Sequence, residues 1–122
     1  MMAVELKSWR KVIEQVVGAI ADESLQRRAW FGVGPEMSSP DEHVCQFLGD
    51  AAIEDFLDRN DTGLNDLQIK AGRNLVKLIR ELLKETSGHL ERSKLIDDPR
   101  WRQIREAAAH FSKLLQTRNM PV

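Results

Sequence analysis

The sequence predicts an all-α protein, a single-domain bundle of about five to six helices around a central helix near residues 64–86. Three observations support this fold class. Apolar residues recur at the three-and-four spacing of helices, turn-forming residues separate these segments, and no stretch alternates as a strand would. A length of 122 residues fits one domain covering residues 1–122. With 42% hydrophobic and 30% charged residues, the composition is that of a soluble globular protein.

The central helix is predicted from the longest uninterrupted pattern, LNDLQIKAGRNLVKLIRELLKE at residues 64–85. Its apolar residues cover an arc wider than a coiled-coil seam, which indicates neighbours on two sides. They are Leu67, Ile69, Ala71, Leu75, Val76, Leu78, Ile79, Leu82 and Leu83. The remaining face carries a basic stripe, formed by Lys70, Arg73, Lys77, Arg80 and Lys84. Like charges at this spacing repel, so we expect acidic partners outside the helix.

The first segment predicts a helix from about residue 4 to residue 20. Its inward residues are Leu6, Trp9, Val12, Ile13, Val16, Val17 and Ile20. Asp22 or Ser24 could cap a second short helix, ESLQRRAWF, although one bent helix fits the sequence equally well. Its inward residues would be Leu25, Ala29 and Trp30. Two glycines and a proline at residues 32–35 then form a turn, and an exposed aromatic beside it would be a protein-contact anchor.

The next helix has a clear start in Ser39-Pro40-Asp41-Glu42, where serine at N-cap, proline at N1 and glutamate at N3 predict a capping box. We expect its apolar side to be Val44, Phe47 and Leu48. Gly49-Asp50 should interrupt it, with Asp50 capping a further helix that turns Ile53, Phe56 and Leu57 inward. Residues 60–63 then form a polar turn before the central helix.

The last third of the chain predicts one further long helix. Ser87-Gly88 closes the central helix, and HLERSKLI is either a short helix or a packed connection. Asp98 at N-cap and Pro99 at N1 start the last helix. Its core face is Trp101, Ile104, Ala108, Phe111, Leu114 and Leu115. The final residues, QTRNMPV, should fray.

The near-neutral net charge of −1 hides a strong asymmetry. Residues 41–66 hold eight acidic side chains against one basic, and residues 67–122 hold twelve basic against six acidic. We expect the acidic segment to fold back across the turn at 60–63 and pair with the basic stripe. Acids left over would form a negative surface that suits a basic partner. The candidate partner-binding residues are Asp50, Glu54, Asp55, Asp58 and Asp61.

No pattern predicts an enzyme, a cofactor site or a metal site. The turn DRNDTGLNDLQI matches several positions of a calcium loop but has Ile69 where the bidentate glutamate should stand. The spacing of His43 and Cys45 does not suit a metal, and we expect surface or core-edge histidines and a small buried thiol. A single cysteine and the lack of a signal-peptide or membrane-spanning run predict a cytoplasmic protein.

One stretch, AWFGVGPEMSSPDEHVCQFLGDAAIEDFL, together with the length and the helical pattern, resembles the small bacterial immunity proteins of contact-dependent inhibition and other polymorphic toxin systems. The resemblance covers roughly the first half of the chain and carries over no site residues. It implies a cytosolic protein that neutralises a cognate toxin by binding it. A carboxylate-rich helical surface would suit a basic toxin domain.

We therefore expect a small protein–protein interaction module, with toxin immunity as its specific version. The alternative is a nucleic-acid-binding or regulatory module that uses the basic stripe of helix 64–86. The near-neutral net charge and the acidic neighbour argue against nucleic acid as the partner. A homodimer is a third interpretation, and the sequence leaves the oligomeric state open.

Overall fold

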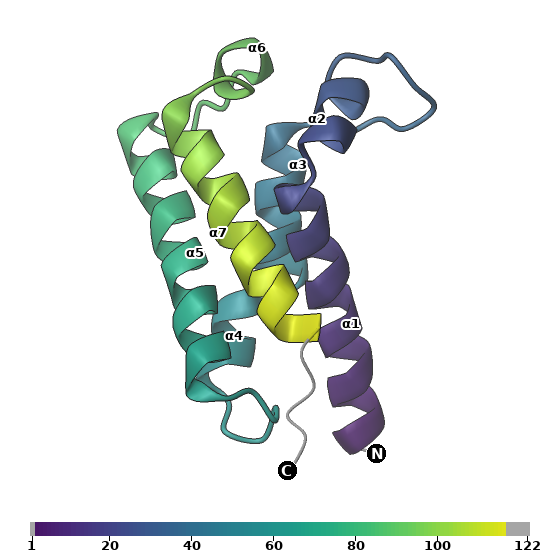
Figure 1. Cartoon of the computed structure of the whole chain (residues 1–122), viewed down its shortest axis with the longest axis vertical. Helices are drawn as coiled ribbons and strands as arrows, with labels where there is room; N and C mark the ends of the chain where they lie inside the picture. Colours follow the sequence, from purple (N-terminus) through teal and green to yellow (C-terminus); the bar gives the residue numbers. More distant parts are fainter. Residues whose placement is uncertain (1, 117–122) are drawn as a thin grey trace.

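Three long helices lie side by side in the computed structural model, and shorter helices cover one face and one end of this layer (Figure 1). The structure describes residues 2–116, with side chains from residue 5. The segment predicted to fray begins at Gln116, which is still part of the last helix, and its other residues, 117–122, lie outside the described range. All elements in the described part are helical, which confirms the all-α fold class. They are α1 (Met2–Ala21), α2 (Glu23–Ala29), α3 (Pro40–Cys45), η1 (Gln46–Asp50), α4 (Ile53–Asp58), α5 (Asp66–Glu85), α6 (Arg92–Leu95) and α7 (Pro99–Gln116).

Helix α7 lies between α1 and α5 and packs along both (Figure 1). Helix α5 also has neighbours on two sides, α7 and α4, as its wide apolar arc predicts. The largest fully buried side chains include predicted core residues from each long helix and from the shorter helices before α5, among them Ile13, Trp30, Phe47, Leu75 and Trp101. The first segment is two helices, not one bent helix, because the chain leaves the helical conformation at Asp22.

The predicted helix boundaries are confirmed where capping residues stand. The side chains of Asp22 and Ser39 accept hydrogen bonds from the backbone N–H groups of Leu25 and Glu42, 3.0 and 3.1 Å away. Asp98 accepts from the backbone of Arg100 at 2.8 Å. Helix α5 begins with a reciprocal capping box between Asn65 and Gln68. It ends before Gly88, which adopts a φ of 78°.

Two residues predicted to face the core are exposed. Leu67 is 67% exposed, because at the first turn of α5 the neighbouring Gln68 takes the inward position and donates to the Leu114 carbonyl at 2.8 Å. Val12 is 41% exposed, since it lies at the edge of the α1 stripe whose buried members include Ile13 and Val16. Periodicity places a residue on a wheel but does not show where the neighbouring helix ends.

The interruption predicted at Gly49-Asp50 lies two residues later, at Ala51-Ala52. The chain continues from α3 through one turn of π-helix, η1, in which the Ala51 N–H donates to the Gln46 carbonyl at 2.7 Å. Asp50 does not cap α4; the N-cap is Ala52, in a left-handed conformation with φ 47° and ψ 53°. The indole of Trp9 fixes this corner by donating to the Ala51 carbonyl at 2.6 Å.

Gly72 of α5 lies where α4 and α7 both pack closely against this helix. It is buried in α5, and a Cβ at this position would lie 2.8 Å from Leu57 of α4 and 3.0 Å from Phe111 of α7. Both neighbours are themselves buried, so neither side chain can move aside into solvent. The missing side chain therefore sets how tightly α4 and α7 pack on α5.

We predict that Gly72→Ala lowers the free energy of unfolding by about 1–3 kcal/mol, because overpacking outweighs the gain in helix propensity. The matched control is Gly18→Ala in α1, where an added Cβ meets nothing within 4 Å. That change should raise stability by up to about 1 kcal/mol. Urea denaturation followed by circular dichroism measures both. Equal shifts for the two variants would contradict this packing constraint.

We also predict that Ala52→Gly raises the free energy of unfolding by about 0.5–1 kcal/mol, because glycine relieves the left-handed strain and only part of that gain is lost to backbone entropy. The control is Ala51→Gly, where φ is −79° and no such strain exists. That variant should be less stable than the wild type. A loss of stability in Ala52→Gly, measured by the same denaturation, would contradict the prediction.

Candidate functional site

Three of the five predicted partner-binding carboxylates lie in internal ion pairs. Glu54 pairs with Arg80, and Asp58 pairs with Arg73 at 2.9 Å. Asp61 accepts two hydrogen bonds from Arg59, at 2.8 and 2.6 Å. These contacts hold the pKa of Asp61 below its ordinary range through the bound Arg59 guanidinium. Asp50 and Asp55 are exposed, and within residues 5–116 their side chains have no partner.

The pairing of the acidic segment with the basic stripe is confirmed for Arg73 and Arg80. Helix α4 folds back antiparallel to α5, so Asp58 meets the earlier arginine and Glu54 the later one. Lys77 lies 4.0 Å from Glu81 on its own helix. Lys70 and Lys84 have no partner within the described part of the chain. The side chains of both inter-helix ion pairs are about half exposed, so each pair contributes little to the free energy of folding. Their main effect is to set how α4 is aligned along α5.

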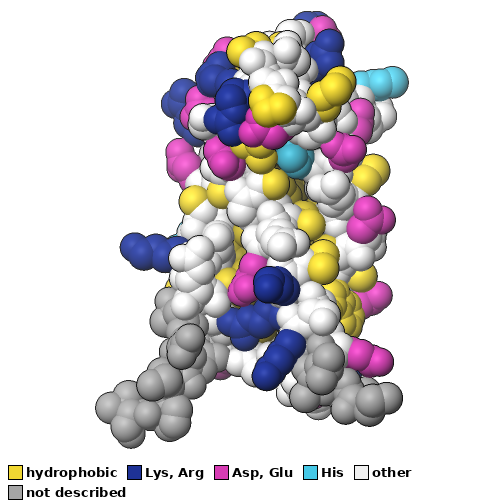
Figure 2. Space-filling view, turned by 90° about the vertical axis from the view of Figure 1, so that its right-hand side faces the viewer, with side chains coloured by type: hydrophobic (Ala, Val, Ile, Leu, Met, Phe, Trp, Pro, Cys, Tyr) yellow, Lys and Arg dark blue, Asp and Glu magenta, His cyan; other side chains and the backbone are white. Residues whose placement is uncertain are grey.

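Unpaired acids remain on the consecutive elements α3, η1 and α4. No Lys or Arg occurs from Ala29 to Asp58, a segment with seven carboxylates. Four of these are exposed and, within the described residues, have side chains with no hydrogen-bond or ion-pair partner: Asp41, Glu42, Asp50 and Asp55, the acidic strip. Acidic side chains recur down the right-hand edge of Figure 2, on the side where α3 lies.

The loop between α2 and α3 exposes apolar side chains. Phe31 is 42% exposed, Val33 75% and Met37 84%, and Pro35 between them is also exposed. We call residues 31–37 the apolar loop. It projects beyond α2 in Figure 1, and hydrophobic side chains appear at the upper end of the surface in Figure 2. Phe31 is thus an exposed aromatic beside the glycine turn, whereas Trp30 is buried.

Hydrogen bonds at its base brace the apolar loop. The Val33 N–H donates to the Arg28 carbonyl at 3.0 Å, and the Ser38 N–H donates to the Ala29 carbonyl at 3.3 Å. The Arg28 guanidinium crosses the loop to Glu36 at 3.1 Å and holds the pKa of that carboxyl below its ordinary value. These contacts join the two ends of the loop, so its projecting part rests on a fixed base.

His43 and Cys45 differ from expectation. His43 is buried, not at the surface or the core edge, with its ring 5.9 Å from that of Trp30 and its Nε2 3.2 Å from the Ser38 hydroxyl. Cys45 is exposed, not a buried thiol, because the inward positions of α3 are taken by His43 and Val44. The His43 Nδ1 is buried and has no hydrogen-bond partner among the described residues.

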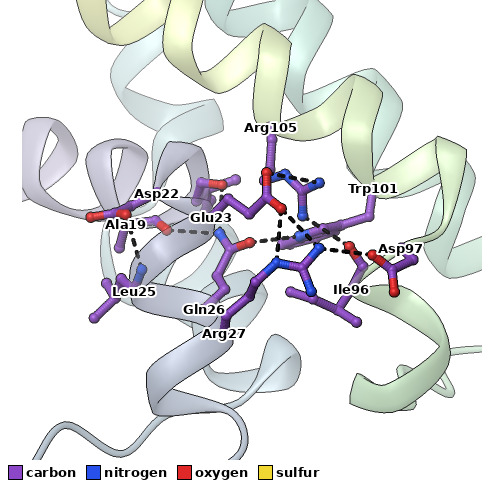
Figure 3. Close-up of polar contacts among 11 residues, drawn as sticks. Ala19, Asp22, Glu23, Leu25, Gln26, Arg27, Ile96, Asp97, Trp101 and Arg105 are labelled. Atoms are coloured by element: carbon purple, nitrogen blue, oxygen red, sulfur yellow. Dashed lines mark hydrogen bonds and ion pairs between the residues drawn. The ribbon is translucent and has the colours of Figure 1, made fainter. Parts of the chain in front are cut away.

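A polar cluster joins α1, α2 and α7 (Figure 3). Gln26 is fully buried; its amide donates to the carbonyls of Ala19 and Ile20 at 2.9 and 2.7 Å and accepts from the Trp101 indole at 3.0 Å. Buried Arg105 donates to the Ile96 carbonyl at 3.1 Å. Sequence reasoning missed both polar residues. The position of each residue in the sequence could have indicated its burial, since each adjoins apolar residues on the inward face of its helix.

An open hollow of about 450 Å³ adjoins this cluster. Arg27 contacts Glu23 and Asp97 at 2.8 Å each and lowers the pKa of both carboxyls, while Arg105 lies 3.6 Å from Glu23. The lining also includes Arg102 and carries acids and bases in equal number. Because most of these charges already have partners, we interpret the cluster as a clamp that holds α2 and residue 97 against α7.

Three further findings concern metal sites, membrane spans and similarity to known proteins. Within the described residues, no group of three or more His, Cys, Asp or Glu side chains could hold a metal ion. None of the helices described here is long and apolar enough to cross a membrane. No protein-family model matches the chain, and comparisons with curated proteins and with solved structures found no match.

We predict that protonation of His43 destabilises the fold. Burial lowers the pKa of this imidazole from its ordinary 6.5, an effect that Glu42 partly offsets. Below pH 6.5 the unfolded chain therefore binds more protons than the folded chain, so stability falls as the pH drops from 7 through the folded pKa. His43→Gln should flatten this dependence between pH 7 and 5, measured by denaturant unfolding. Parallel curves for the variant and the wild type would contradict the assignment to His43.

Proposed function

We propose that this protein is a small cytoplasmic protein-binding module that neutralises a basic toxin domain by binding it. The observation that carries the proposal is the acidic strip: Asp41, Glu42, Asp50 and Asp55 stay unpaired among the described residues after the nearby arginines have been engaged elsewhere. Unpaired carboxylates on one face favour a partner with a positive surface and speed its association. The resemblance to immunity proteins supplies the specific version of this function.

The electrostatic argument is strengthened by the absence of Lys and Arg from Ala29 to Asp58. A basic partner that approaches this surface meets no repelling charge from the segment that forms it. Glu54 and Asp58, predicted as contact residues, contribute less, because each is already paired with an arginine of α5. Among the five predicted residues, Asp50 and Asp55 are therefore the ones whose charge remains available for a partner.

The alternative, a nucleic-acid-binding module on the basic stripe, has weaker support. Arg73 and Arg80 are occupied by carboxylates of α4, which lie where phosphates would have to bind. Lys70 and Lys84 are left, at opposite ends of α5. A salt-dependent gel shift with duplex DNA or RNA that is lost in Lys70→Glu/Lys84→Glu would favour this alternative over protein binding.

The proposed function is tested with the product of a toxin gene adjacent to the gene for this protein in its native genome. We predict that the two proteins form a complex and that Asp50→Lys/Asp55→Lys weakens it at least about tenfold, because charge attraction becomes repulsion. Isothermal titration calorimetry at two salt concentrations measures the affinity, and rescue of toxin-expressing cells measures neutralisation.

A matched control is Glu81→Lys/Glu106→Lys, which changes the net charge by the same amount at exposed positions on α5 and α7. This control should keep affinity within about twofold if the contact is local to the acidic strip. Equal losses in both double variants would indicate attraction by net charge alone. No complex with the adjacent toxin would overturn the proposed function.

A further inference from the structure

We propose that the apolar loop is the anchor of the binding surface, and that it packs against an apolar patch rimmed by lysine and arginine on a protein partner. This inference rests on the proposed function in one respect, the basic character of the partner. It adds a second contact of different chemistry: the acidic strip supplies attraction, and Phe31, Val33 and Met37 supply the apolar area that leaves water on binding.

In the apolar loop, apolar side chains face solvent and polar side chains face the protein, the reverse of an ordinary surface loop. The exposed side chains at positions 31, 33, 35 and 37 are all apolar, whereas the polar side chains of Glu36 and Ser38 are less exposed. One carboxylate oxygen of Glu36 is buried beside Gly34, where an added Cβ would lie 3.0 Å from it. The polar groups thus turn toward the protein while apolar side chains face water, which marks an interaction site.

The loop is also prepared for binding before any partner arrives. Contacts of Arg28 with Glu36 and of Ser38 with Ala29 and His43 fix its base. On its other flank the Arg92 guanidinium of α6 lies 6.0 Å from the centre of the Phe31 ring. A braced loop loses less conformational entropy on association than a free one, so more of the apolar contact appears as affinity.

The unpaired charges that follow the loop in the chain are acidic. The loop leads directly into α3, whose first turn carries Asp41 and Glu42, and no Lys or Arg lies between Ala29 and Asp58. Of the two arginines at its other side, Arg28 is paired with Glu36 and Arg92 lies against the Phe31 ring. Of the five large hydrophobic side chains exposed in the described chain, three lie in the loop. An apolar patch with a lysine and arginine rim complements both parts of this surface.

The test uses a fluorescein-labelled synthetic amphipathic helix of leucine and lysine as the probe, followed by fluorescence anisotropy. We predict that Val33→Ser/Met37→Ser lowers its affinity about tenfold, because two apolar contacts are lost. Leu67→Ser is the matched control, since Leu67 is 67% exposed but lies at the first turn of α5. It should leave the affinity unchanged, and circular dichroism checks that both variants keep the fold.

Further variants and a second probe separate the contribution of the apolar loop from that of the acidic strip. Loss of probe binding in Asp50→Lys/Asp55→Lys together with unchanged binding in Val33→Ser/Met37→Ser would overturn the anchor and leave the acidic surface standing. A leucine and glutamate helix that binds as tightly as the lysine probe, and is weakened by the loop variant, would support the anchor and overturn the basic partner. Equal weakening by Leu67→Ser, or no binding of the lysine probe to the wild type, would overturn the anchor.

Discussion

The buried amide of Gln26 is the interaction on which the arrangement of the upper half of the molecule depends. The last carbonyls of any helix lack partners within it. In α1 the Ile20 carbonyl accepts from the Gln26 amide, and the Ala19 carbonyl accepts from the same amide and from the Asp22 N–H. The Gln26 oxygen accepts the indole N–H of Trp101 in α7. Every polar group of the contact is thereby paired, and an unpaired group in the core would cost about 1–3 kcal/mol. The direction of α2 relative to α1 and α7 follows from the three bonds of Gln26.

The position of the apolar loop, part of the candidate surface, depends on this junction. Trp30, the C-cap of α2, is buried with its ring centre 5.5 Å from that of Trp101, and the apolar loop begins at the next residue. The clamp of Arg27 on Glu23 and Asp97 holds the same helix from the outside. At its far end the loop is tied to α3 through Ser38 and His43. A buried polar contact thus determines where apolar side chains meet solvent.

Much of the fold could be predicted from the sequence because its determinants are local. Asp22, Ser39 and Asp98 cap the helices that they were expected to cap, and helical periodicity identified most of the buried apolar residues. The antiparallel pairing of α4 with α5 also followed from charge and a short turn.

The errors came from contacts distant in sequence. The π-helical turn at η1 depends on Trp9, forty-two residues before the carbonyl that it binds. The burial of His43 and Gln26 depends on Trp30 and Trp101, and the role of Gly72 depends on two other helices. For the candidate site, composition identified the acidic segment, but only the fold shows which of its carboxylates are engaged. In α4, the carboxylates that face α5 are the ones that form ion pairs with its arginines.

The absence of Lys and Arg from Ala29 to Asp58 has a consequence for how the molecule can be handled. Primary amines lie only outside this segment, so coupling through lysine attaches the protein to a support without modifying the candidate surface. Trypsin finds no cleavage site between Arg28 and Arg59, so the whole surface is released as one peptide. The single thiol, Cys45, is exposed on α3 among the acids and would carry a label into the middle of that peptide.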